Sequence, residues 1–330
     1  MRAKGSTLPD TGTEPGTDLT VTTDDGTPLA GTLTLPATPG PHPAVLLLHG
    51  SGPLDRDGNT PKLPVELGGP LAALLAAEGI ATLRYDRRGT GANPGNWRTA
   101  GFTTNREDAS AALRALAAHP AVRPDSLGVV GHSEGAVHAM ALAARHPEVR
   151  AVVLLAGYAR LGEDALRWQA RSVAQGLPAP VRLLRRPLGA LGNLALARIK
   201  KTRTDVARIA GAPMNARWTR EMLAHDSRDD LAGIHAPVLA VTGDKDIQVD
   251  PADLDEIRRL VPGSAEIHRV PDLNHLLRRD PGRPTMSSYR RLLREPVDAD
   301  VLSLVTTWLN HQLVPAAGET SGRGSTALPS

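Results

Sequence analysis

Three residue types that together carry out acyl transfer occur in order along the chain. Ser133 stands between two glycines in V-V-G-H-S-E-G-A-V, at the spacing G-x-S-x-G. Asp246 follows in D-K-D-I-Q-V, and His275 follows in P-D-L-N-H-L-L. A serine hydroxyl becomes an effective nucleophile when a base takes its proton, and a histidine base needs a carboxylate to orient it. The order serine, acid, histidine predicts a Ser133–Asp246–His275 catalytic triad.

Each member also has a structural interpretation. A serine between glycines is unremarkable in a chain with 32 glycines, and a lone histidine is more often an ordinary loop residue. Among the acids, Asp246 is preferred because Asp244 directly follows a glycine turn and is expected to cap it. Asp272 is disfavoured because it is too near His275 in sequence. The matching order of three loops, rather than any single motif, favours catalysis.

Acyl transfer also requires N–H donors aimed at the oxyanion that forms on the substrate. One predicted donor is the backbone N–H of Glu134, directly after the serine. The other comes from H-G-S-G-P, which follows the apolar run A-V-L-L-L; Ser51 is preferred there and Gly52 is the alternative. His49 and Gly50 form the supporting turn. A tight turn is also the structural interpretation, and His49 is expected to pack and hydrogen-bond rather than act as a base.

The elements that must position these loops follow from hydrophobic periodicity. Alternating residues on either side of Asp25-Gly26 predict a hairpin at a sheet edge. The fully apolar run at residues 44–48 is typical of a buried parallel strand. Further strands are expected at 80–85, 126–131, 151–156, 237–243 and 265–270, and helices at 65–78, 104–118, 134–145, 253–261 and 298–313. This alternation predicts an α/β fold with a mostly parallel, doubly wound sheet. The predicted site loops then meet at the carboxyl edge of the strands.

One interval breaks the alternation. Residues 158–235 have helical character without a strand-like run and are too long for a structureless loop. We expect a helical cap inserted into a core formed by residues 18–157 and 236–314. The cap carries 14 Arg and Lys against 7 Asp and Glu. Solvation of its surface is the favoured interpretation, and attraction of anionic substrates is the alternative. Residues 1–17 and 315–330 are expected to be disordered.

Three tryptophans are candidate walls of a substrate pocket in a chain with 2% aromatic residues. Trp168 and Trp218 lie in the predicted cap, and Trp97 lies in a loop of the core. The alternative, slightly favoured, is that they anchor the cap to the sheet.

Several stretches resemble the α/β-hydrolase superfamily, near its dienelactone-hydrolase and prolyl-peptidase-like side. H-G-S-G-P-L-D-R-D-G-N, G-H-S-E-G, G-D-K-D-I-Q-V and N-H-L-L are similar, in order and spacing, to bacterial EstD-type carboxylesterases. Y-D-R-R-G-T-G resembles the superfamily's structural loop beside the serine turn, and W-T-R-E-M-L-A-H-D resembles a cap helix that returns to the core. The resemblance covers roughly residues 19–313. It implies an α/β-hydrolase fold and a carboxylesterase-like serine hydrolase (EC 3.1.1 type) that uses Ser133, His275 and Asp246.

The composition limits which classes of partner and cofactor are expected. The chain has no cysteine, which excludes disulfides, thiolate metal sites and a cysteine nucleophile. Its net charge is +3 and no nucleic-acid recognition motif is present, so nucleic acid is not an expected partner. No secretory signal and no run of about 18 apolar residues is found, so no membrane partner and a cytoplasmic location are expected. No metal or other cofactor is implied.

The expected partner is a small-molecule ester or thioester. A thioesterase or an acyltransferase could use the same residues, and a non-catalytic ligand binder on this fold is the alternative outside enzymes. A peptidase is less favoured because no β-propeller-sized domain precedes the core. Acyl and alcohol specificity and the oligomeric state are not readable from the sequence.

Overall fold

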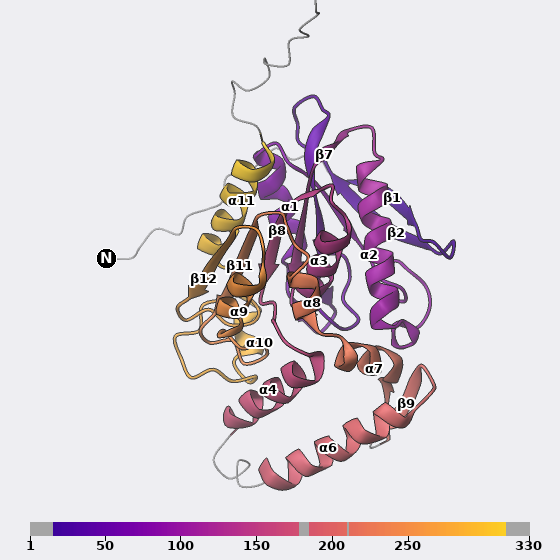
Figure 1. The fold of residues 1–330 in the computed structure, drawn as a ribbon, viewed down its shortest axis with the longest axis vertical. Coiled ribbons are helices and arrows are strands. Elements are labelled where there is room, and N and C mark those ends of the chain that lie inside the picture. Colours follow the sequence, from indigo (N-terminus) through magenta and orange to yellow (C-terminus); the bar gives the residue numbers. More distant parts are fainter. Residues whose placement is uncertain (1–15, 178–184, 210, 315–330) are drawn as a thin grey trace, which may run out of the picture.

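The computed structural model describes residues 16–177, 185–209 and 211–314. Its centre is a twisted sheet of eight strands (Figure 1). Across the sheet the order is β1 (Thr17–Thr22), β2 (Pro28–Thr34), β6 (Ala81–Tyr85), β3 (His42–Leu48), β7 (Val122–His132), β8 (Val149–Leu155), β11 (Val238–Gly243) and β12 (Ala265–Val270). The strands from β6 to β12 are parallel, and β1 and β2 form the expected antiparallel hairpin at one edge. The predicted mostly parallel sheet is confirmed.

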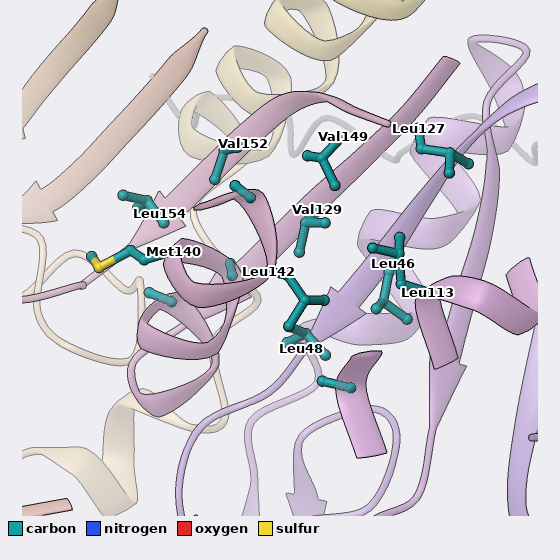
Figure 2. Close-up of a cluster of buried hydrophobic side chains, with 14 of the residues drawn as sticks. Leu46, Leu48, Leu113, Leu127, Val129, Met140, Leu142, Val149, Val152 and Leu154 are labelled. Atoms are coloured by element: carbon teal, nitrogen blue, oxygen red, sulfur yellow. The ribbon is translucent and has the colours of Figure 1, made fainter. Parts of the chain in front are cut away.

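Helices cover both faces of the sheet because the central strands are apolar on both sides. In β3, Leu46 and Leu48 pack toward α2 (Phe102–Ala117) and α3 (Glu134–Arg145), whereas Val45 and Leu47 pack toward α1 (Gly68–Ala77) and α11 (Ala299–Leu313). The helix α9 (Asp253–Leu260) joins the α3 side. Figure 2 shows part of that core, where Leu46 lies among strand and helix side chains. Each such side chain contributes about 1.5–3 kcal/mol when fully buried.

In the described residues between β8 and β11, six elements follow one another. They are α4 (Gly162–Gln175), α6 (Arg185–Lys201), β9 (Val206–Ile209), β10 (Ala212–Asn215), α7 (Ala216–Ala224) and α8 (Ser227–Leu231). Of these, α4, α6 and α7 lie at the carboxyl edge of the sheet (Figure 1). The expectation that this interval holds no strand is wrong, because β9 and β10 pair as an antiparallel hairpin. The β-branched ends of β9 suit a strand, and Gly211 has a φ of +82°, a conformation that suits a turn.

Other differences are local. The helix expected from residue 65 begins at Gly68 because Glu66 has a φ of +50° and its N–H bonds the Asn59 side chain at 2.7 Å. The preceding residues form a small hairpin of β4 (Asn59–Thr60) and β5 (Leu63–Pro64). The short helices η1 (Trp97–Thr99) and α10 (Tyr289–Leu292) were not expected. The predicted disorder at 1–17 and 315–330 falls outside the described residues, except for 16 and for Thr17, which begins β1.

Among the described residues, no helix combines the length and the apolar character needed to cross a membrane.

Candidate active site

Ser133 occupies the turn between β7 and α3. Its φ of 56° and ψ of −118° lie outside the usual regions for a residue with a side chain, which costs about 1–3 kcal/mol. The turn is held by two backbone hydrogen bonds: Ser133 N–H donates to Leu155 O at 2.9 Å, and Ser133 O accepts from Ala136 N–H at 3.0 Å. The strain therefore persists because the neighbouring strand and helix fix both sides of the serine.

The two glycines of G-H-S-E-G are required by close packing. A Cβ on Gly131 would lie 2.1 Å from the carbonyl oxygen of Gly135. A Cβ on Gly135 would lie 2.1 Å from the carbonyl oxygen of Leu48, at the end of β3. Both distances are far shorter than any van der Waals contact, so the sharp turn at Ser133 is possible only with glycine at these positions.

The structure brings Ser133, His275 and Asp246 together in one hydrogen-bonded chain. Ser133 Oγ lies 3.0 Å from His275 Nε2, and His275 Nδ1 lies 2.8 Å from Asp246 Oδ2. The other carboxylate oxygen of Asp246 accepts hydrogen bonds from the backbone N–H groups of Gln248 at 2.7 Å and Val249 at 2.9 Å. Asp246 and His275 are both buried. The arrangement can pass a proton from the serine hydroxyl to the imidazole.

The two other aspartates considered for this position lie elsewhere. Asp244 is exposed, and its Oδ1 accepts a hydrogen bond from the backbone N–H of Asp272 at 2.7 Å. Asp272 is half-buried and has a φ of 56°. Asp244 therefore organises the loop that carries His275, and neither residue is hydrogen-bonded to that histidine.

The H-G-S-G-P loop lies directly against Ser133. A Cβ on Gly50 would lie 3.3 Å from Ser133 Cβ. Ser51 and Gly52 follow on the rim, and in the described part of the chain the Ser51 backbone N–H donates no hydrogen bond. Glu134 is the first residue of α3, so its N–H has no acceptor within the helix. The two segments next to Ser133 thus each carry a backbone N–H that donates no hydrogen bond among the described residues.

His49 supports this loop as a neutral residue. Its Nδ1 lies 3.1 Å from the carbonyl oxygen of Gly50. Desolvation and the nearby Arg87 lower the pKa of His49 to about 3. It forms no hydrogen bond with Ser133.

His132 supports the histidine loop, a role that the sequence did not indicate. Its ring is buried, and Nε2 lies 2.9 Å from the carbonyl oxygen of His275. Burial and the neighbouring His275 lower the pKa of His132 to about 4, so the neutral ring donates this hydrogen bond. The only sequence signal is its position directly before Ser133.

The side chain of Glu134 is the centre of a buried network that sequence reasoning also missed. Its carboxylate receives hydrogen bonds from Trp218 Nε1 at 2.9 Å, His138 Nε2 at 3.0 Å and Asn105 Nδ2 at 3.2 Å. Arg87 Nη1 lies 3.2 Å from Glu134 Oε2. Burial opposes the charged carboxylate, but Arg87, His138 and Trp218 outweigh that effect and hold the pKa of Glu134 well below its usual range.

Arg87 links this network to the H-G-S-G-P loop. Its Nη2 donates a hydrogen bond to the carbonyl oxygen of His49 at 2.5 Å while Nη1 pairs with Glu134. The same guanidinium therefore holds both segments that present free N–H groups beside Ser133. The sequence indicated Arg87 only through its place in Y-D-R-R-G-T-G, the stretch that resembles a structural loop beside the serine turn.

Three pockets open around this centre. The inner pocket, of about 110 Å³, reaches Ser133 and His275 and has apolar walls that include Leu54, Val65 and Leu71. The cap pocket, of about 90 Å³, lies between Ser133 and cap residues that include Leu166 and Met222. The side pocket, of about 280 Å³, is lined by Trp97, Arg98, Met214 and Trp218 and shares Ser51 and Glu134 with the cap pocket.

The three candidate tryptophans differ in whether they line a pocket. Trp97 and Trp218 line the side pocket, and Trp218 also lines the cap pocket. Trp168 is half-buried on α4 and lines none of these three pockets. Among the described cap residues, no arginine or lysine lines the three pockets either, so their cationic groups come from the core.

Residues 67–282 match the family described as Serine aminopeptidase, S33, one of the α/β hydrolases. The chain belongs to this family. Together with the mostly parallel eight-stranded sheet, this match confirms the predicted α/β-hydrolase fold.

Similar proteins include several esterases. Esterase EstD of Thermotoga maritima is 29% identical over 287 residues, which cover 85% of this chain and 65% of EstD. The chain thus spans about two thirds of that relative's length. The structure of Est1E from Butyrivibrio proteoclasticus with bound ferulic acid matches at a TM-score of 0.60 and 18% identity, over 89% of this chain and 96% of that one. The structure of a dienelactone hydrolase from Anabaena variabilis matches at a TM-score of 0.54 and 18% identity, over 91% of this chain and 99% of that one.

Proposed function

We propose that this protein is a carboxylesterase that works through an acyl-enzyme on Ser133. The observation that carries the proposal is the unbroken chain from Ser133 Oγ through His275 to Asp246, at 3.0 Å and 2.8 Å, on a strained turn at a helix N-terminus. The esterases among its similar proteins support the same class of substrate.

The reaction follows from the positions of these groups. His275 Nε2 takes the Ser133 proton while Oγ attacks the ester carbonyl carbon, and Asp246 stabilises the imidazolium. The backbone N–H groups of Ser51 and Glu134 stabilise the oxyanion. The imidazolium then protonates the leaving alcohol. Water activated by His275 attacks the acyl-serine, which releases the acid and returns the proton to Ser133.

The charges around Ser133 favour an ester over a peptide with a free amino terminus. An aminopeptidase needs a negative group to hold the substrate ammonium. Among the described residues that line the three pockets, the carboxylates are Glu134, which is paired with Arg87, and Asp57, which is paired with Arg84. No unpaired carboxylate is therefore available for an ammonium group.

The test is the variant Ser133→Ala, measured with p-nitrophenyl acetate and with a fluorophosphonate that reacts with activated serines. We expect loss of both hydrolysis and labelling, because the nucleophilic oxygen is removed.

A matched control exists within the chain. Ser110 Oγ lies 2.6 Å from His146 Nε2, and His146 Nδ1 lies 3.0 Å from Glu148 Oε1. Ser110 sits on the regular helix α2, and none of these three residues lines any of the three pockets. Ser110→Ala should therefore keep full activity and labelling. Labelling of Ser133→Ala at the wild-type level would refute the proposal.

A further inference from the structure

The side pocket has a net positive charge that the proposed ester hydrolysis does not use. Three arginines line it: Arg87, Arg88 and Arg98. Arg87 is paired with Glu134, and Arg88 is paired with Asp25 and Asp108. Among the described residues, Arg98 has no carboxylate partner. Its guanidinium is therefore the uncompensated charge of this pocket.

The walls around Arg98 are aromatic and apolar. The Arg98 guanidinium stacks over the Trp97 ring at 4.6 Å from its centre, which leaves the edge of the guanidinium free to form hydrogen bonds. Trp218 forms another wall, and its orientation is fixed because Nε1 donates to Glu134. Met214 completes the lining and is 38% exposed, an unusual position for a large apolar side chain unless something covers it.

One residue, Asn215, joins the two sides of the pocket. Asn215 donates hydrogen bonds from Nδ2 to the carbonyl oxygens of Trp97 at 3.2 Å and Ala100 at 2.7 Å. Its Oδ1 accepts from the backbone N–H of Trp218 at 2.9 Å. Asn215 thus joins the η1 loop of the core to the start of α7 in the cap. The two tryptophan walls are fixed relative to each other without a ligand.

We propose that the side pocket binds a planar, aromatic carboxylate that forms one half of the ester substrate. The ring lies between Trp97, Trp218 and Met214, and the carboxylate pairs with Arg98. The pocket meets Ser51 and Glu134, so a group bound there reaches the oxyanion donors, and the smaller apolar half of the ester occupies the inner pocket. This inference rests on the proposed esterase function and adds its substrate class.

The test compares esters that carry a free carboxylate with the compounds in which that carboxylate is methylated. One pair places the aromatic ring in the alcohol: 4-acetoxybenzoate and its neutral methyl ester. The other places it in the acid: monomethyl and dimethyl terephthalate. In at least one pair, we expect Arg98→Met to lower kcat/KM for the anionic member tenfold or more and for the neutral member less than twofold. Arg98→Lys should restore part of the difference, since it keeps the charge but not the planar fork.

The matched control is Arg171→Met, which removes an exposed arginine of α4 outside the three pockets. Arg171→Met changes the net charge by the same amount as Arg98→Met. In both pairs it should leave unchanged the ratio of kcat/KM for the anionic ester to kcat/KM for the neutral ester. An equal effect of Arg98→Met and Arg171→Met would overturn the inference, and so would an Arg98→Met effect that does not distinguish charge.

A binding measurement separates this inference from the proposed function. In Ser133→Ala, tryptophan fluorescence is titrated with 4-hydroxybenzoate and with terephthalate. We expect saturable binding that Arg98→Met weakens tenfold or more and that added salt weakens. If fluorophosphonate labels wild-type Ser133 but neither acid binds, the side-pocket inference is wrong and the hydrolase proposal stands. If both acids bind but no serine is labelled and no ester is cleaved, the hydrolase proposal is wrong.

Discussion

At the scale of single residues, proton-relay geometry alone does not distinguish a reactive serine in this chain. Both Ser133 and Ser110 are hydrogen-bonded to a histidine that contacts a carboxylate. Ser133 differs because it has a strained backbone, a helix N-terminus behind it and pockets in front of it. The strained backbone and the adjoining pockets, together with the hydrogen-bonded triplet, therefore distinguish Ser133 from Ser110.

The choice between two aspartates separated by a single residue gives a prediction at this scale. Asp246→Asn should lower kcat for p-nitrophenyl acetate by about 10⁴-fold, because an amide cannot stabilise the imidazolium and favours the wrong tautomer of His275. Asp244→Asn should change kcat less than threefold, because Asp244 only receives a loop hydrogen bond. Steady-state kinetics of the two variants decide the assignment, and a larger loss in Asp244→Asn would reverse it.

At the scale of elements, the buried network around Glu134 joins parts that lie far apart in sequence. Trp218 of α7 contacts the first residue of α3, and Arg87, which follows β6, contacts the loop after β3. The position of the cap is thereby tied to the position of the proposed oxyanion donors. Removing one member should affect both stability and turnover.

Arg87→Met should separate these two effects. The substitution leaves the Glu134 carboxylate buried without its cation, which should lower the free energy of unfolding by about 3–5 kcal/mol. It also frees the His49 carbonyl, so the Ser51 N–H is less well placed and kcat should fall about 10- to 100-fold, with KM changed little. Urea unfolding and steady-state kinetics measure the two quantities.

A second substitution controls for the buried charge. In Arg87→Met combined with Glu134→Gln, stability should return in large part because no charge is left unpaired. The turnover should stay low, since the His49 carbonyl still lacks its donor. Full recovery of kcat in the double variant would show that Arg87 acts only on stability.

At the scale of the whole molecule, the sequence predicted what depends on local pattern. Apolar runs located the central strands, and G-x-S-x-G between a strand and a helix located the serine turn. What it missed depends on contacts across the chain: the hairpin of β9 and β10 within a helical interval, and the bond from Trp218 to Glu134, 84 residues apart in sequence. The free charge at Arg98 could not be inferred either, because sequence does not show which arginines already have carboxylate partners.

Buried neutral histidines give the molecule as a whole a predictable response to pH. His132 has an ordinary pKa of 6.5 when unfolded, but burial and His275 lower its pKa to about 4 in the folded protein. Burial lowers the pKa of His138 in the same direction. Between these values the unfolded chain binds more protons than the folded one, so stability must fall as the pH falls below 6.5.

His132 adds a slope of up to about 1.4 kcal/mol per pH unit between pH 6.5 and 4, and His138 adds a slope of the same sign below pH 6.5. His132→Gln should reduce the pH dependence of the free energy of unfolding by the contribution of His132. The amide N–H of the new glutamine can still donate to the His275 carbonyl. His235→Gln, which replaces an exposed histidine, is the control substitution. Urea unfolding at pH 7.5, 6.0 and 5.0 measures the three slopes. Equal slopes for the wild type and His132→Gln would mean that His132 is not held neutral by burial.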